Sequence, residues 1–176
     1  MGKQKIDKSR RNFLFGAVRR FKNENPNELE ASTVDAIDVI KAANALYVDG
    51  NWEEARKKYK ECLKSDKSDA DVRYRLGVCS YRLGKYRQAK LEFERTLRLD
   101  RGYKDSLLYL GLTIVRLGKP DKAVALWKQY FNPLAVVVQR ELNLQIGLLE
   151  SGEVDPPETI AEAVEAAILE AGDGVG

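Results

Sequence analysis

Four glycines recur at a constant spacing of 34 residues, at Gly50, Gly84, Gly118 and Gly152. A period of this length is typical of arrays of helical hairpins, in which each unit is a helix, a turn and a second helix. One hairpin cannot bury its own apolar face, so neighbouring hairpins stack and leave a concave side available for binding. The spacing therefore predicts an all-α, superhelical solenoid rather than an enzyme-like globule.

Other positions keep the same register. Alanine follows three of the glycines by five residues and an aromatic residue follows by nine: Ala55, Ala89, Ala123, Tyr59, Phe93 and Trp127. Small residues precede the glycines by seven: Ala43, Gly77 and Gly111. This pattern resembles the tetratricopeptide repeat. The resemblance implies a right-handed superhelix with ungapped repeats at 36–69, 70–103 and 104–137, in an array spanning 32–152.

A fourth, degenerate hairpin follows the three repeats. Residues 138–150 are expected to form its first helix and residues 157–171 its second, because Pro157 is tolerated in a first helical turn. Pro133 is expected to end the second helix of repeat three. The acidic segment 153–176 is therefore interpreted as a terminal cap of the solenoid.

Catalytic and metal-binding chemistry find little support in the composition. The chain has no histidine, which is the commonest general base and a frequent metal ligand. Cys62 and Cys79 stand far from the spacing of a zinc site or a disulfide framework, and we expect both to be buried thiols. No phosphate-binding glycine loop or nucleophile elbow occurs. We therefore expect no enzymatic activity, no cofactor and no metal.

Residues 1–31 differ from the array in charge. Residues 1–22 hold eight lysines and arginines against one aspartate, while seven acidic residues and no basic one follow Gly152. Such asymmetry is typical of interaction tails. Residues 23–30 are interpreted as a polar linker, with Ser32 as the N-cap of the first array helix.

The N-terminal segment is expected to form a basic amphipathic helix. Its docking residues are Arg10, Arg11, Phe13, Leu14, Arg19, Arg20 and Phe21. Such a helix can lie on an anionic membrane, bind a partner, or cap repeat one. The paired arginines before Phe13 also resemble an export signal, but charges follow at once where such a signal needs an apolar stretch.

The resemblance to tetratricopeptide repeats also implies which residues line the groove. The implied positions on the first helix of each repeat are Ile37, Ile40, Lys41, Asn44, Tyr47, Val48, Asp71, Tyr74, Arg75, Val78, Tyr81, Arg82, Asp105, Leu108, Tyr109, Leu112, Val115 and Arg116. The best-known groove of this family binds the C-terminal carboxylate of a chaperone through lysine, asparagine and arginine residues. Only Asn44 matches that set here, so a chaperone tail is not the expected ligand. The predicted partner-binding residues are Asn44, Tyr47, Tyr74, Arg75, Tyr81, Arg82, Tyr109 and Arg116. The alternative for each tyrosine is packing between helices.

The acidic C-terminal helix has one apolar stripe, formed by Ile160, Val164, Ala167 and Ile168. The opposite side is expected to carry Glu158, Glu162 and Glu165. The stripe is expected to pack on the preceding helix, and self-association of acidic tail with basic head is the alternative.

These features predict a non-catalytic adaptor in a reducing cytoplasm, which binds a peptide or helix of another protein, apolar with some acidic character. The alternative is a peripheral scaffold or assembly factor for a membrane-bound complex, recruited by its basic N-terminal segment. Nucleic acid is not the expected partner, because the basic charge is confined to one short segment.

Overall fold

The computed structural model describes residues 26–153 and 155–173, so the predicted N-terminal docking segment lies outside the described residues. The described part is all-α and contains no strand. Its helices are α2 (Pro26–Val48), α3 (Trp52–Ser65), α4 (Ala70–Arg82), α5 (Tyr86–Leu99), α6 (Lys104–Arg116), α7 (Pro120–Trp127), α8 (Val136–Ser151) and α9 (Pro157–Asp173).

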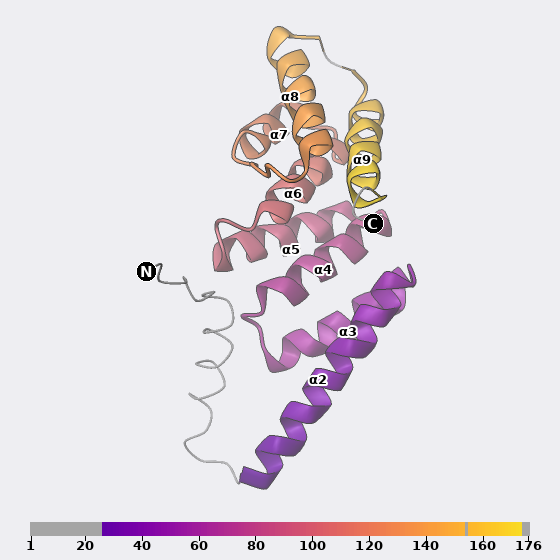
Figure 1. Cartoon of the computed structure of the whole chain (residues 1–176), viewed down its shortest axis with the longest axis vertical. Coiled ribbons are helices and arrows are strands. Elements are labelled where there is room, and N and C mark those ends of the chain that lie inside the picture. The colour runs from indigo at the N-terminus through magenta and orange to yellow at the C-terminus, as the bar shows by residue number, and fades with distance from the viewer. Residues whose placement is uncertain (1–25, 154, 174–176) are drawn as a thin grey trace.

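Successive helices pair as antiparallel hairpins that stack along the long axis of the molecule (Figure 1). Each of α3, α5 and α7 packs against its own first helix and against the first helix of the next hairpin. Each apolar face is thereby buried between neighbours. This stacking confirms the predicted solenoid.

The recurring glycines end the first helix of every hairpin. Gly50, Gly84, Gly118 and Gly152 have φ of 74°, 68°, 73° and 86°, and they are the described residues with positive φ. After each glycine, the next backbone N–H donates to a carbonyl five residues earlier, as from Asn51 to Leu46 at 2.8 Å. This is the Schellman ending, which favours glycine because other residues are strained at positive φ. The 34-residue period therefore marks where the first helix of each hairpin ends.

Two other glycines let paired helices approach closely. A Cβ atom on Gly77 would lie 2.6 Å from the Phe93 ring, and one on Gly111 would lie 2.1 Å from Nε1 of Trp127. Both rings are fully buried. The small residue and the aromatic residue of the repeat are thus the two sides of one contact.

Two predicted helix boundaries are wrong. The first helix begins at Pro26 rather than at Ser32, because proline fits a first turn and no helix-breaking residue follows it before Gly50. Residues 26–30 are therefore helix and not linker.

The second correction concerns α7, which ends at Trp127 and not at Pro133. A continued helix would place Tyr130 at the register position of Cys62 and Thr96, which have smaller side chains. The chain leaves the helix first and still buries Tyr130. Pro133 and an Asn132 side chain that accepts from the Leu134 N–H at 3.2 Å then hold the turn before α8.

Candidate functional site: the concave face

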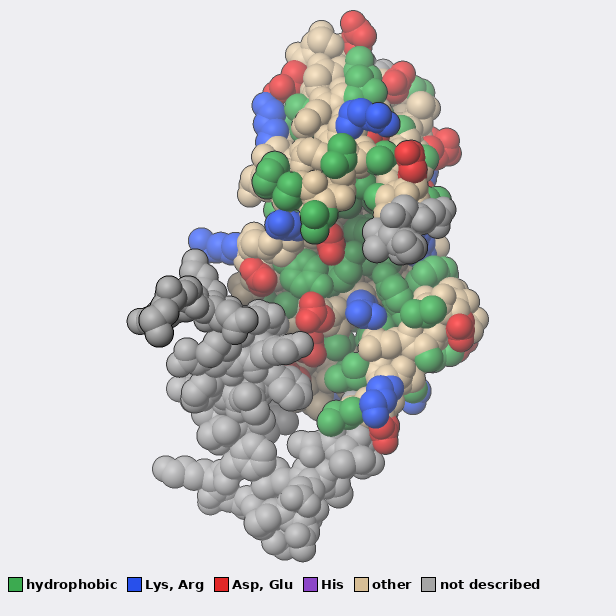
Figure 2. Space-filling model, in the orientation of Figure 1, with side chains coloured by type: hydrophobic (Ala, Val, Ile, Leu, Met, Phe, Trp, Pro, Cys, Tyr) green, Lys and Arg blue, Asp and Glu red, His purple; other side chains and the backbone are tan. Residues whose placement is uncertain are grey.

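The residues predicted to line the groove lie on α2, α4 and α6, the first helices of three consecutive hairpins. We call these eighteen positions of α2, α4 and α6 the concave face. Hydrophobic side chains gather in the hollow at the middle of the molecule, with acidic and basic side chains beside them (Figure 2). The surface therefore offers both apolar area and charge.

A polar cluster joins α2 to α4. Oδ1 of Asn44 accepts hydrogen bonds from the Tyr59 hydroxyl at 2.8 Å and from Nη1 of Arg75 at 3.2 Å. The Arg75 guanidinium also lies 5.5 Å from the centre of the Tyr47 ring. The Tyr47 ring in turn meets Trp52 edge to face at 5.3 Å. These contacts fix the orientation of three predicted partner-binding residues, Asn44, Tyr47 and Arg75.

Tyrosines form the floor between α4 and α6. The Tyr74 ring lies 5.1 Å from Tyr103 and 6.0 Å from Tyr109, and the Tyr81 ring lies 5.7 Å from Tyr109. Burial raises the pKa of Tyr74 well above its usual range, so the phenol stays neutral. Tyr81 and Tyr109 are buried, so these two pack between helices.

A carboxylate from the C-terminal helix reaches this floor. The Tyr81 hydroxyl donates to Oε1 of Glu165, and Nη2 of Arg116 lies 3.1 and 3.2 Å from the two Glu165 carboxylate oxygens. The Arg116 and Glu165 side chains are each largely buried. The prediction that Glu165 lies on the solvent side of its helix is therefore wrong. Glu158 and Glu162 are exposed as expected.

The position of α9 explains this contact. The apolar stripe of α9 packs against α8, as expected, but α9 also folds back onto α6 (Figure 1). The earlier second helices pack forward onto the next hairpin instead. As a result, α9 shares one buried cluster with four concave-face residues of α6: Leu108, Tyr109, Leu112 and Val115.

The concave face thus has two unequal halves. On α6, Leu112 and Val115 are completely buried. On α2, Ile37 is 46% exposed and Val48 is 80% exposed. We call the α2 side with its Asn44, Tyr47 and Arg75 cluster the open half, and the α6 side the covered half.

Three further charged residues of the concave face stand at its edges. Arg82 is exposed at the end of α4. At the opposite helix ends, Asp71 accepts from the Tyr103 hydroxyl at 2.8 Å, and Asp105 lies exposed in the first turn of α6. Basic and acidic side chains therefore flank the tyrosine floor on opposite sides.

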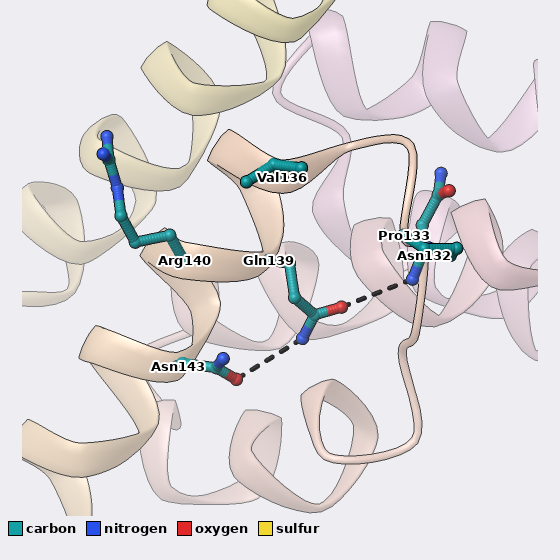
Figure 3. Close-up of a pocket in the computed structure, with 6 residues that line it drawn as sticks. All are labelled: Asn132, Pro133, Val136, Gln139, Arg140 and Asn143. Carbon is teal, nitrogen blue, oxygen red and sulfur yellow. Dashed lines mark hydrogen bonds between the residues drawn. The ribbon is translucent and has the colours of Figure 1, made fainter.

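A separate depression of about 330 Å³ lies at the connection between α7 and α8. The Gln139 side chain accepts from the Asn132 N–H at 3.3 Å and donates to Asn143 at 3.4 Å, while Arg140 points away from them (Figure 3). Pro133 and Val136 complete the lining. Amides already paired with one another offer no acid–base or nucleophilic chemistry here.

Within the described ranges, no group of three or more potential metal ligands comes together, and no helix is long and apolar enough to cross a bilayer. Cys79 is buried as expected, whereas the prediction that Cys62 is buried is wrong, because Cys62 is only half-buried; both thiols are free. Burial raises the pKa of Cys79 to about 12, so its thiol is poorly nucleophilic.

Comparison with known structures finds the same fold. MamA shares 18% identity with a TM-score of 0.61, over 96% of this chain and 99% of that one. The first tetratricopeptide domain of Spaghetti (RPAP3), bound to the HSP90 peptide SRMEEVD, is 18% identical to this chain, with a TM-score of 0.56. The match covers 64% of this chain and 93% of the RPAP3 chain. PcrH in complex with the chaperone-binding region of PopB is 20% identical to this chain, with a TM-score of 0.53. The match covers 76% of this chain and 94% of the PcrH chain.

A search among proteins of curated function found no match. Two family models described as tetratricopeptide repeat match residues 46–102 and 80–130. These matches cover the hairpins in which glycine, alanine and aromatic residues recur in register, and the structure has the stacked hairpins that the family implies. Residues 46–130 of this chain therefore match tetratricopeptide repeats, and the described helices have the fold that such repeats form.

Proposed function

We propose that this protein is a non-catalytic adaptor, which binds a helix or extended segment of a partner protein on the open half of its concave face. The observation that carries the proposal is the exposure of Ile37 and Val48 beside side chains already fixed by hydrogen bonds. Exposed apolar residues next to a positioned arginine and tyrosines are typical of binding hot spots. Because these groups are ordered before binding, little conformational entropy is lost.

The chemistry of the open half indicates the ligand. Its apolar rim favours aliphatic side chains, and the Arg75 guanidinium favours a carboxylate. An apolar segment with some acidic character fits both. The RPAP3 and PcrH structures support the idea, because both hold a segment of another protein on this fold. A reducing cytoplasm is the proposed location, since the free thiols need no oxidising compartment.

Site-specific photo-crosslinking tests this proposal. A photoreactive phenylalanine analogue is placed at Ile37 or Val48 on the open half, and at Lys57 or Lys60 on α3 as matched exposed controls. The expected result is one crosslinked species shared by the first two positions and missing from the controls. A species found equally at all four positions, or none at Ile37 and Val48, contradicts the assignment.

Arg75→Gln provides the matched chemical test. This change keeps a hydrogen-bonding side chain and removes the charge, so we expect the crosslinked yield at Val48 to fall about tenfold. Lys60→Gln removes the same charge from α3 and should leave the yield unchanged. Circular dichroism of each variant checks that helix content is preserved.

The charge of residues 1–22 favours a second candidate, recruitment to an anionic membrane. Co-sedimentation with phosphatidylserine vesicles tests it. Binding that is lost on deleting residues 1–22 and weakened by salt supports recruitment, and equal sedimentation of both forms rejects it.

A further inference from the structure

We propose that Tyr81 and Arg116 form an exchangeable carboxylate-binding site for an acidic helix, which α9 occupies through Glu165 in the free protein. The inference goes beyond the proposed function, since it assigns a second ligand contact, on the covered half of the same concave face. The C-terminal helix is then a built-in competitor of a partner helix.

The site is assembled from two consecutive first helices. Tyr81 comes from α4 and Arg116 from α6, and both reach the same carboxylate of Glu165. A hydroxyl and a guanidinium that converge in a largely buried position recognise a carboxylate more strongly than exposed groups do. The Tyr81 ring packs edge to face against Tyr109 of α6, so the array itself orients the hydroxyl of this site.

The placement of α9 differs from that of the earlier second helices, because α9 packs on α6 as well as on its hairpin partner α8. The second helices α3, α5 and α7 pack forward along the array, whereas α9 turns back over α6. It presents small and branched apolar residues, Ile160, Ala161, Val164 and Ala167, which are buried in the cluster that contains the α6 side of the groove. A helix with an apolar stripe and an adjacent carboxylate lying in a groove is a recurring mode of peptide recognition.

Occupancy of the site by α9 sets a threshold for any competing helix. A tethered helix acts at an effective concentration of about millimolar, so a free helix binds only if it is tighter or if α9 is weakened. Weakening the Glu165 contact in the chain should therefore strengthen binding of an added acidic helix by the same factor.

A peptide copying residues 157–173, labelled with fluorescein, is the probe, and fluorescence anisotropy measures its binding to the full chain. Glu165→Gln in the protein removes the charge and keeps the side-chain size. We expect this variant to bind the peptide about tenfold more tightly than the wild-type chain does. Glu162→Gln is the control, because Glu162 is exposed on the same helix; its affinity should equal that of the wild type.

The peptide also carries its own control. A second peptide with Glu165→Gln should bind the Glu165→Gln protein about tenfold more weakly than the unaltered peptide. Adding Arg116→Gln to the protein should abolish this difference. A merely structural role for Glu165 would loosen α9 without discriminating between the two peptides.

Two results overturn the proposal. One is equal peptide affinity for the wild-type and Glu165→Gln chains, and the other is equal affinity of the two peptides for the Glu165→Gln chain. Neither depends on the crosslinks at Ile37 and Val48. Loss of the crosslinks alone rejects the adaptor surface, whereas loss of peptide discrimination alone rejects the carboxylate site.

Discussion

The two halves of the concave face share one repeat register and have opposite environments. Asn44 on α2 and Leu112 on α6 occupy the same position of their repeats, yet Asn44 is half-buried and hydrogen-bonded while Leu112 is completely buried. The second helices packed beside them also differ. α3 packs forward and leaves α2 accessible, whereas α9 turns back and shares a buried cluster with α6.

This contrast shows how a repeat array acquires a defined binding site. The repeat fixes which positions face the groove, and the ends of the array decide which of those positions a partner can reach. A surface that looks uniform in the repeat pattern is therefore divided into an accessible part and a self-occupied part.

The largest expected effect is on the stability of the covered half. Leu112→Ala removes a fully buried side chain and should lower the free energy of unfolding by about 3 kcal/mol. Ile37→Ala on the open half should change it by less than about 0.5 kcal/mol. Urea unfolding followed by circular dichroism measures both. Equal losses would mean that the two halves are equally buried.

A smaller effect is expected at the basic residues of the concave face. Arg116→Gln leaves the Glu165 carboxylate largely buried without its ion-pair partner, and should cost about 1 to 3 kcal/mol. Arg82→Gln alters an exposed side chain, so it should change the free energy of unfolding by less than about 0.5 kcal/mol. If both variants unfold at the same urea concentration, the Glu165 contact does not stabilise the covered half.

The smallest effect concerns the core beneath the open half, where Cys79 is buried. Because burial raises the pKa of Cys79 to about 12, its alkylation by iodoacetamide at pH 8 should be at least about a hundredfold slower than in urea. The folded pKa exceeds the unfolded one, so this thiol favours folding below about pH 8.5 and less so as pH rises above it. Rapid alkylation of Cys79 in the folded protein would show that the reagent reaches the core beneath the open half.

Much of this structure could be predicted from the period of 34 residues, because glycine at a helix end and the glycine–aromatic contact are local requirements. Gly77 with Phe93 and Gly111 with Trp127 had to meet wherever hairpins of this length form. The start of α2 and the end of α7 could not be placed, since Pro26 precedes the first repeat and Tyr130 departs from the small residue at its position in the repeat.

The groove positions could be named by register, but their exposure could not, because it depends on which helices pack around each position. Glu165 was the residue missed. It lies four residues after Ala161 and three before Ile168, so it borders the apolar stripe of its helix. That spacing was the signal in the sequence that Glu165 could lie toward the groove rather than toward solvent.

Cysteine accessibility at two valines, one on each half of the concave face, tests the central comparison most directly. Val48→Cys lies on the open half and Val115→Cys on the covered half, and the substitution is small in both places. Labelling with a maleimide, followed by mass spectrometry of peptides, should show Cys at position 48 reacting at least about a hundredfold faster than Cys at position 115. Similar rates at the two positions would contradict the division of the concave face into an open and a covered half.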